Sequence, residues 1–134
     1  MLDKPDAADL LEAIGEFLTH EVVPELSGRK RFHALVAANL TRILVRQTRL
    51  GAALQEREIA RLRALLDRPA AMPLPPSADE RDRHELELSC ELVRRIEDGE
   101  ADDSPWGDRL FAYLKESVAD KLRIDNPKML GEDA

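Results

Sequence analysis

The stretch RFHALVAANL, residues 31–40, places a histidine and an asparagine in a segment that is otherwise apolar. At about 100° per residue, Asn39 lies inside the apolar stripe of a helix here and His33 lies at its edge. Two further polar side chains are placed to meet them: Glu21 on the preceding segment, and Gln47 two turns beyond Asn39. If Glu21, His33, Asn39 and Gln47 converge, they form a polar pocket suited to a small ligand.

Two other interpretations of these four residues stay open. A buried asparagine needs hydrogen-bond partners, so the four could form a small polar network that fixes how two helices dock, at some cost in stability. Asn39 could also face a second subunit. The docking network is the more ordinary arrangement, and it predicts that the Asn39 amide is buried and hydrogen-bonded.

A second candidate site is basic. Residues 27–68 contain ten arginines and lysines against three acids, whereas residues 1–26 and 69–134 carry net charges of −6 and −8. Pairing with these acidic flanks, inside the domain or between subunits, is the ordinary explanation, and a phosphorylated ligand or an acidic macromolecule is the alternative. The net charge of −7 and the lack of interleaved aromatic side chains argue against nucleic acid. The candidate anion patch comprises Arg42, Arg46, Arg49, Arg57 and Arg61.

The sequence contains no motif typical of catalysis or of metal binding. It has no glycine-rich phosphate loop, no HExxH or CxxC pair and no GxSxG elbow, and its three histidines lack helical-repeat spacing. Cys90 lies on an apolar stripe and is expected to be a buried, inert thiol. A single cysteine and the lack of a signal-peptide or membrane-span pattern predict a cytoplasmic protein without cofactor, metal or membrane partner. We therefore favour a protein that is not an enzyme.

Aromatic residues make up only 4% of the chain, so Leu, Ile, Val and Ala must supply the core. This composition favours helices, and helices must therefore position the candidate residues. Asp6 can cap a first helix, and Ser104 followed by Pro105 starts a last one. Gly51 either ends the second helix or lies within a longer one. Hydrophobic periodicity predicts five helices, at about 6–23, 29–50, 52–66, 78–97 and 104–124. Their predicted inward residues include Leu10, Ile14, Phe17, Phe32, Val36, Asn39, Leu40, Ile59, Leu62, Leu66, Leu86, Cys90, Val93, Ile96, Trp106 and Leu110.

These elements predict an all-α fold. We expect one domain over residues 1–134, a five-helix, up-down-like bundle with a proline-rich crossing at about 68–78 between helices three and four. The crossing should drape over the bundle and bury Met72 and Leu74. The second predicted helix is apolar on nearly all sides over ALVAANL. Its outer face must therefore be buried by the proline-rich crossing or by a second subunit. We predict a twofold homodimer that buries more than about 1,000 Å², with helix two or three at its centre.

Three short stretches, LSGR at 26–29, FHALVAAN at 32–39 and KLRIDNPKML at 121–130, carry a family resemblance. With their surroundings, FLTHEVVPELSGRKRFHALVAANL and LFAYLKESVADKLRIDNPKML, they resemble a family of small all-helical bacterial proteins of unknown function. Its members are often encoded beside aminoglycoside-phosphotransferase-like kinases and acyl-CoA dehydrogenases. The resemblance implies no catalytic residue, only an accessory role near acyl-CoA or phosphotransfer metabolism.

Together these observations favour a non-enzymatic helical accessory or interaction module with a protein partner. The alternative is a small-molecule-binding protein or minor enzyme with a polar pocket between helices one and two.

Overall fold

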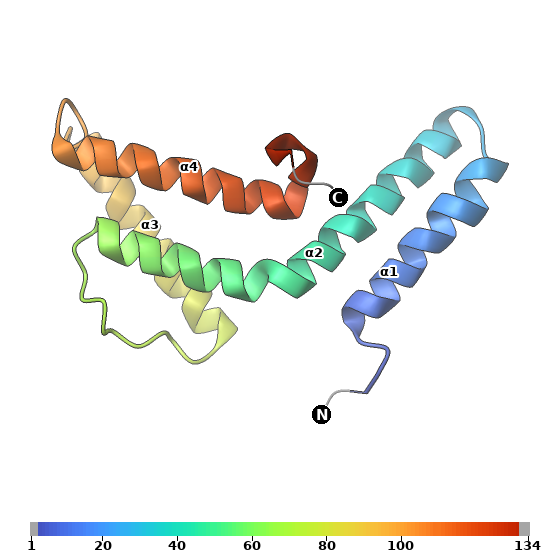
Figure 1. The fold of residues 1–134 in the computed structure, drawn as a ribbon, viewed down its shortest axis with the longest axis horizontal. Helices are drawn as coiled ribbons and strands as arrows, with labels where there is room; N and C mark the ends of the chain where they lie inside the picture. Colours follow the sequence, from blue (N-terminus) through green and yellow to red (C-terminus); the bar gives the residue numbers. More distant parts are fainter. Residues whose placement is uncertain (1–2, 132–134) are drawn as a thin grey trace. The chain divides into compact units, whose positions relative to one another are not determined.

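The computed structural model describes residues 3–131, and these form four α-helices and no strand. The helices are α1 (Ala7–Phe17), α2 (Gly28–Leu65), α3 (Ala78–Glu97) and α4 (Pro105–Asp125), followed by a 3₁₀ turn at Pro127–Leu130 (Figure 1). The all-α class is confirmed, but the prediction of five helices is wrong. α2 continues through Gly51, because one interior glycine costs only about 1 kcal/mol and no proline interrupts the segment.

Local hydrogen bonds fix where the helices begin. The Asp6 carboxylate accepts from the Asp9 backbone N–H at 3.0 Å, and the Asp9 carboxylate accepts from the Asp6 N–H at 3.1 Å. This capping box confirms the predicted start of α1. At α4, the Ser104 hydroxyl accepts from the Gly107 N–H at 3.0 Å, and Pro105 is the first helical residue. Its missing N–H costs nothing at that position.

The chain folds into two compact units. The hairpin unit contains the described residues 3–52 and 122–131, and the three-helix unit contains residues 53–121. Residues of α2 and of α4 belong to both units. The organisation of the chain as one domain stays a prediction.

In the hairpin unit, α1 lies antiparallel beside the first half of α2 (Figure 1). The two helices meet through small side chains, and the residues buried along this contact include Ala8, Gly15, Ala34, Ala38 and Thr41. A Cβ added at Gly15 would lie 2.6 Å from Thr41 Oγ1, so the two helices approach closely at this point. No Leu, Ile, Phe or Met is buried among the described residues of this unit.

The predicted inward stripes of the first two helices face outward instead. Because the backbones approach through Ala, Gly and Thr, little space remains between them for large side chains. The stripe that periodicity identifies is real, but it lies on the face opposite the contact. Its members Leu10, Ile14, Phe17, Phe32, Val36 and Leu40 are between 41% and 63% exposed.

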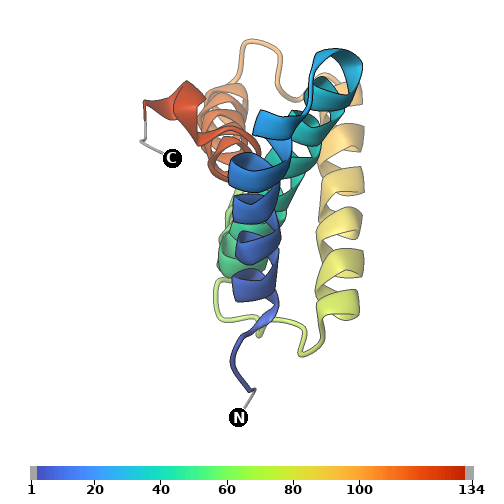
Figure 2. The ribbon, with the colours of Figure 1, turned by 90° about the vertical axis from the view of Figure 1, so that its right-hand side faces the viewer.

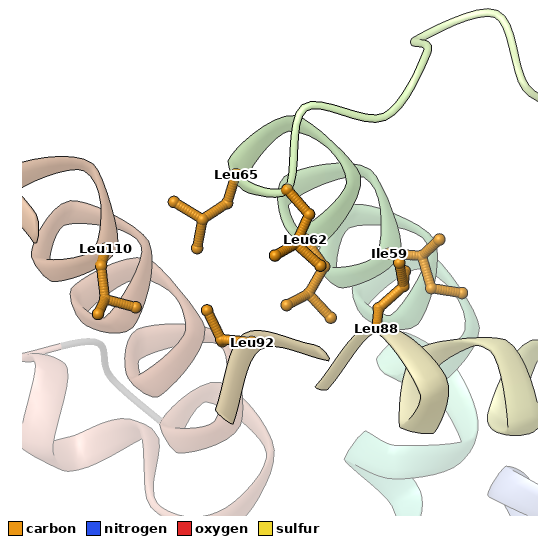
Figure 3. Packing of buried hydrophobic residues seen from close by; sticks show 7 residues of the cluster. Ile59, Leu62, Leu65, Leu88, Leu92 and Leu110 are labelled. Carbon is orange, nitrogen blue, oxygen red and sulfur yellow. The ribbon is translucent and has the colours of Figure 1, made fainter. Parts of the chain in front are cut away.

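The three-helix unit has a conventional apolar core. The second half of α2 contributes Ile59 and Leu62, both fully buried, and their neighbours come from α3 and α4 (Figure 3). Trp106 packs against this cluster, and its indole Nε1–H donates to the Leu65 carbonyl at 3.0 Å. The cluster comprises Ile59, Leu62, Leu65, Leu66, Leu88, Leu92 and Leu110.

On α3, too, the buried stripe is not the predicted one. Leu88 and Leu92 face the core, whereas Leu86, Val93 and Ile96 are exposed, and so is Cys90. The prediction of a buried Cys90 thiol is therefore wrong. Both stripes have helical spacing, so periodicity alone could not choose between them.

The proline-rich crossing connects α2 to α3 through residues 66–77 (Figure 2). The buried Arg63 guanidinium holds it by donating to the carbonyls of Met72, at 2.8 Å, and Pro73, at 3.1 Å. The side chains of Met72 and Leu74 remain 40% and 38% exposed, so the prediction that they are buried is wrong. Hydrogen bonds to the backbone, rather than apolar burial, hold the segment in place.

Candidate functional site

A groove of about 1050 Å³ runs between α1, the first half of α2 and the segment that ends α4. All of its residues belong to the hairpin unit. Basic side chains outnumber acidic ones along it, and apolar side chains supply part of its walls. We call it the arginine groove, and its lining residues are Leu11, Glu12, Gly15, Glu16, Asn39, Thr41, Arg42, Val45, Arg46, Arg49, Leu50, Arg123, Asp125, Asn126, Pro127 and Lys128.

Two arginines of α2 connect it to α1. Arg49 donates to the Glu12 carboxylate at 3.0 Å, and this hydrogen bond raises the pKa of the Arg49 guanidinium. Two turns earlier, Arg42 donates at 3.1 Å to the hydroxyl of Thr19, in the short π-helical segment Leu18–Val22 that follows α1. Because Arg42 and Arg49 lie on the same side of α2, they fix one edge of α1 against it.

Arg46, between them on the helix, holds the third wall of the groove. Its Nε donates to the Ile124 carbonyl at 2.6 Å, and a terminal nitrogen donates to the Asp125 carbonyl at 3.4 Å. These carbonyls belong to the last turn of α4, where no intrahelical partner remains for them. The positive guanidinium also complements the negative end of the α4 dipole.

The structure divides the predicted anion patch between the two units. Arg42, Arg46 and Arg49 line the arginine groove. In the three-helix unit, by contrast, Arg61 pairs with Asp120 at 2.5 Å, and Arg57 reaches the same carboxylate at 3.5 Å. Arg57 and Arg61 are thus paired with a carboxylate of the acidic C-terminal flank.

The four residues of the predicted polar pocket do not come together. Asn39 lines the arginine groove and is exposed, so the prediction that it is buried is wrong. The exposed His33 accepts a hydrogen bond from Arg29 Nε at 3.3 Å, and its ring lies edge-on to Phe32. Glu21 and Gln47 are exposed and do not line the groove. The physical reason is the same as for the stripes: α2 presents its small residues, not Asn39, to α1.

Sequence reasoning missed the part of the groove that comes from the C-terminal segment. Arg123, Asn126 and Lys128 lie far along the chain from α1 and the first half of α2. The signal available was the stretch KLRIDNPKML, which carries the family resemblance and contains all three residues. Nothing in the sequence indicated that this stretch returns to the first two helices.

A second surface of the hairpin unit is apolar. At about 100° per residue, its members on α1 lie roughly 150° around the helix from Glu12 and Glu16. On α2 most of them lie a similar angle away from the groove arginines, with Phe32 at the edge. This surface therefore covers the side of the hairpin that faces away from the groove. We call it the apolar face, and it comprises Leu10, Ile14, Phe17, Phe32, Val36, Leu40 and Leu44, all exposed.

The three-helix unit carries a half-buried polar cluster. The Tyr113 hydroxyl and the Ser117 hydroxyl, at 2.9 Å, both donate to one oxygen of the Glu58 carboxylate. Burial, and then the hydrogen bond to Glu58, raise the pKa of the Tyr113 phenol above its ordinary value. A tyrosine held protonated in this way is a structural donor, and it ties α4 to α2 within this unit.

Residues 3–131 contain no group of three or more His, Cys, Asp and Glu side chains arranged to hold a metal ion. In the same part of the chain, every helix is too short or too polar to cross a membrane. The surfaces of chemical interest are therefore the arginine groove and the apolar face.

No curated protein and no solved structure matches the chain. A protein family described as Domain of unknown function (DUF6285) matches residues 24–129. This match includes all of α2, α3 and α4, and the C-terminal segment of the groove. The chain therefore belongs to the DUF6285 family.

Proposed function

We propose that the protein is a non-enzymatic helical interaction module that works as a homodimer, with the apolar face as its interface. The observation that carries this proposal is the inverted packing of the hairpin unit. The residues buried in it are Ala, Gly, Thr, Val and Pro, and many of its large apolar side chains, including all seven of the apolar face, are exposed. Two helices joined by small residues bury too little apolar surface to be stable alone, so this unit requires further cover.

The exposed area is of the size that a stable dimer needs. Each residue of the apolar face is between 41% and 63% exposed. A fully buried aromatic residue removes about 150–250 Å² from water, so each half-exposed phenylalanine offers about 100 Å², and each smaller aliphatic residue offers less. The seven side chains therefore offer at most about 700 Å² per copy, and two copies would bury at most about 1,400 Å² together. Stable interfaces bury about 1,200–2,000 Å².

The charges around the apolar face fit a second copy of the same chain. Residues 3–25 carry seven acids and one lysine, whereas residues 28–52 carry six basic residues and no acid. A twofold arrangement that sets α1 of one copy beside α2 of the other brings these opposite charges together along the rim. An arrangement that sets α1 beside α1 and α2 beside α2 would instead bring like charges together.

The experiment compares Leu40→Glu with Leu86→Glu by sedimentation equilibrium. Both leucines are exposed, at 53% and 64%, so neither substitution removes a core side chain. Leu40→Glu places a charge in the proposed interface and should shift the protein toward monomer, while Leu86→Glu on α3 should leave the dimer intact. A wild-type mass equal to one chain, or equal dissociation by both variants, would refute the proposed interface.

The family resemblance adds a proposed context. It favours a cytoplasmic bacterial protein with an accessory role beside acyl-CoA dehydrogenases or aminoglycoside-phosphotransferase-like kinases. A purified dehydrogenase or kinase from the same gene neighbourhood should bind the wild-type dimer in a titration. Failure of every such neighbour to bind would remove the context and leave the dimer proposal standing.

A further inference from the structure

The arginine groove carries positive charge that its own carboxylates do not neutralise. Arg42 is hydrogen-bonded to the Thr19 hydroxyl and Arg46 to two backbone carbonyls, and these acceptors are neutral. Five basic side chains and three acidic ones, Glu12, Glu16 and Asp125, line the groove, so its balance of charge is positive. Glu12 pairs with Arg49 at 3.0 Å, and Glu16 lies 3.0 Å from His20 Nε2.

Further donors converge on the same space. Lys128 lines the groove from the C-terminal segment, and no carboxylate among the described residues is paired with it. Asn39 precedes Arg42 by one turn on the same side of α2 and adds an amide N–H₂ group. The groove therefore offers two guanidinium groups, an ammonium group and an amide donor to one ligand.

Arg46 is ordered before any ligand arrives. Its Nε and one terminal nitrogen are held by the last carbonyls of α4, which leaves its other terminal nitrogen available. An ordered guanidinium binds phosphoryl oxygens at a lower entropic cost than a free side chain. Arginine is also the residue whose planar fork best matches phosphate oxygens.

The remaining walls indicate what else the ligand carries. Val45, Leu50 and Pro127 line the groove beside these donors. The volume of about 1050 Å³ is far larger than a phosphate group needs and lies at the upper end of small-molecule sites, which measure about 300–1,000 Å³. A free inorganic anion would leave this apolar surface in water.

We propose that the arginine groove binds a small organic phosphate, with its phosphoryl group at Arg42, Arg46 and Lys128 and its apolar body against Leu50 and Pro127. This site is independent of the proposed dimer, because the apolar face lies on the other side of the hairpin. A dimer would therefore present two such grooves.

The test uses phenyl phosphate as the probe, titrated into the full chain by isothermal calorimetry. Inorganic phosphate, which lacks the apolar body, should bind at least about tenfold more weakly, and benzyl alcohol, which lacks the charge, should not bind. Arg42→Gln should weaken phenyl phosphate binding about tenfold or more, because it removes a charge-assisted hydrogen bond. Arg42 is exposed, so its loss leaves the core intact.

Arg94→Gln, an exposed position on α3, is the matched control and should leave binding unchanged. Lys128→Gln is the second test variant and should weaken binding from the opposite wall of the groove. The proposal is overturned if phenyl phosphate does not bind at millimolar concentration. It is also overturned if Arg94→Gln weakens binding as much as Arg42→Gln, or if inorganic phosphate binds as tightly as phenyl phosphate.

Discussion

At Gly15, where α1 and α2 approach closely, we expect a glycine-to-alanine substitution to change the free energy of unfolding in the direction opposite to the usual one. Replacing an interior helical glycine by alanine normally stabilises a protein by about 1 kcal/mol. In this protein the added Cβ would lie 2.6 Å from Thr41 Oγ1 and 3.6 Å from Thr41 Cβ. Thr41 cannot easily move aside, because it is buried and its hydroxyl donates to the Ala38 carbonyl at 2.7 Å. Overpacking of this kind costs about 1–3 kcal/mol.

Gly15→Ala should therefore be neutral to destabilising by about 2 kcal/mol in the wild-type background. In a Thr41→Ala background the clashing oxygen is gone, and the remaining Cβ at 3.6 Å is an ordinary contact. There the same substitution should stabilise by about 1 kcal/mol. The double-mutant cycle should thus give a coupling energy of about 1–3 kcal/mol between positions 15 and 41.

The assay is urea denaturation of the wild type, both single variants and the double variant, followed by circular dichroism at one fixed protein concentration. A fixed concentration matters because dimerisation adds to the apparent stability. If Gly15→Ala stabilises the protein equally in both backgrounds, the two helices do not pack through this contact, and the account of the hairpin unit fails.

Three further predictions concern the α2 helix and the three-helix unit. Leu62→Ala should lower the free energy of unfolding by about 2–5 kcal/mol in urea denaturation, because Leu62 is fully buried. Gly51→Ala should raise the free energy of unfolding by about 1 kcal/mol. Only the flexible end of the Gln47 side chain, 2.5 Å from the added Cβ, has to move. A destabilised variant would indicate a break in α2. Burial and the Glu58 carboxylate raise the pKa of Tyr113 above its ordinary value of 10.0, so its stabilisation is complete below that pH and is lost as pH rises beyond it. Tyr113→Phe should therefore cost about 1–2 kcal/mol near neutral pH and progressively less in alkaline solution, and a cost that does not change with pH would contradict this assignment.

The starts of the helices could be predicted because they depend on neighbours in the sequence. Asp6 and Asp9 form a capping box across three residues, and Ser104 with Pro105 starts α4 in the same local way. The all-α class follows from composition and periodicity for a similar reason. These features need no knowledge of which helices pack together.

On the second half of α2, Ile59, Leu62 and Leu66 are buried as their spacing predicts. The direction in which α1, the first half of α2 and α3 face could not be predicted, because two apolar stripes compete on each of them. On α2, Phe32, Val36 and Leu40 form the more hydrophobic stripe, but Ala34 and Ala38 allow the closer contact with α1. Which stripe is buried depends on the partner helix, and Gly15 on α1 is what makes the close contact feasible. The prediction that Asn39 is buried was wrong for the same reason, because it assumed that the stripe of Phe32, Val36 and Leu40 faces inward.

The candidate site was predictable only where it lies on one helix. Arg42, Arg46 and Arg49 share one side of α2 by their spacing alone, and they do line one groove. Arg57 and Arg61 continue the basic run in the sequence, but they pair with Asp120 in the other unit. The contribution of Lys128 depends on a tertiary contact that Arg46 makes with the end of α4, and a contact between residues so distant in sequence leaves no local pattern.

The most direct test of the central claim, that the apolar face is the interface between two copies, is an isotope-filtered NOE experiment on mixed labelled and unlabelled chains. Only contacts between different copies give signals in such a sample. We predict intermolecular signals from the methyl groups of Ile14 and Leu40, which are 50% and 53% exposed in the single chain. Intermolecular signals confined to Leu86 or Val118 in the three-helix unit, or a monomer without any such signal, would contradict it.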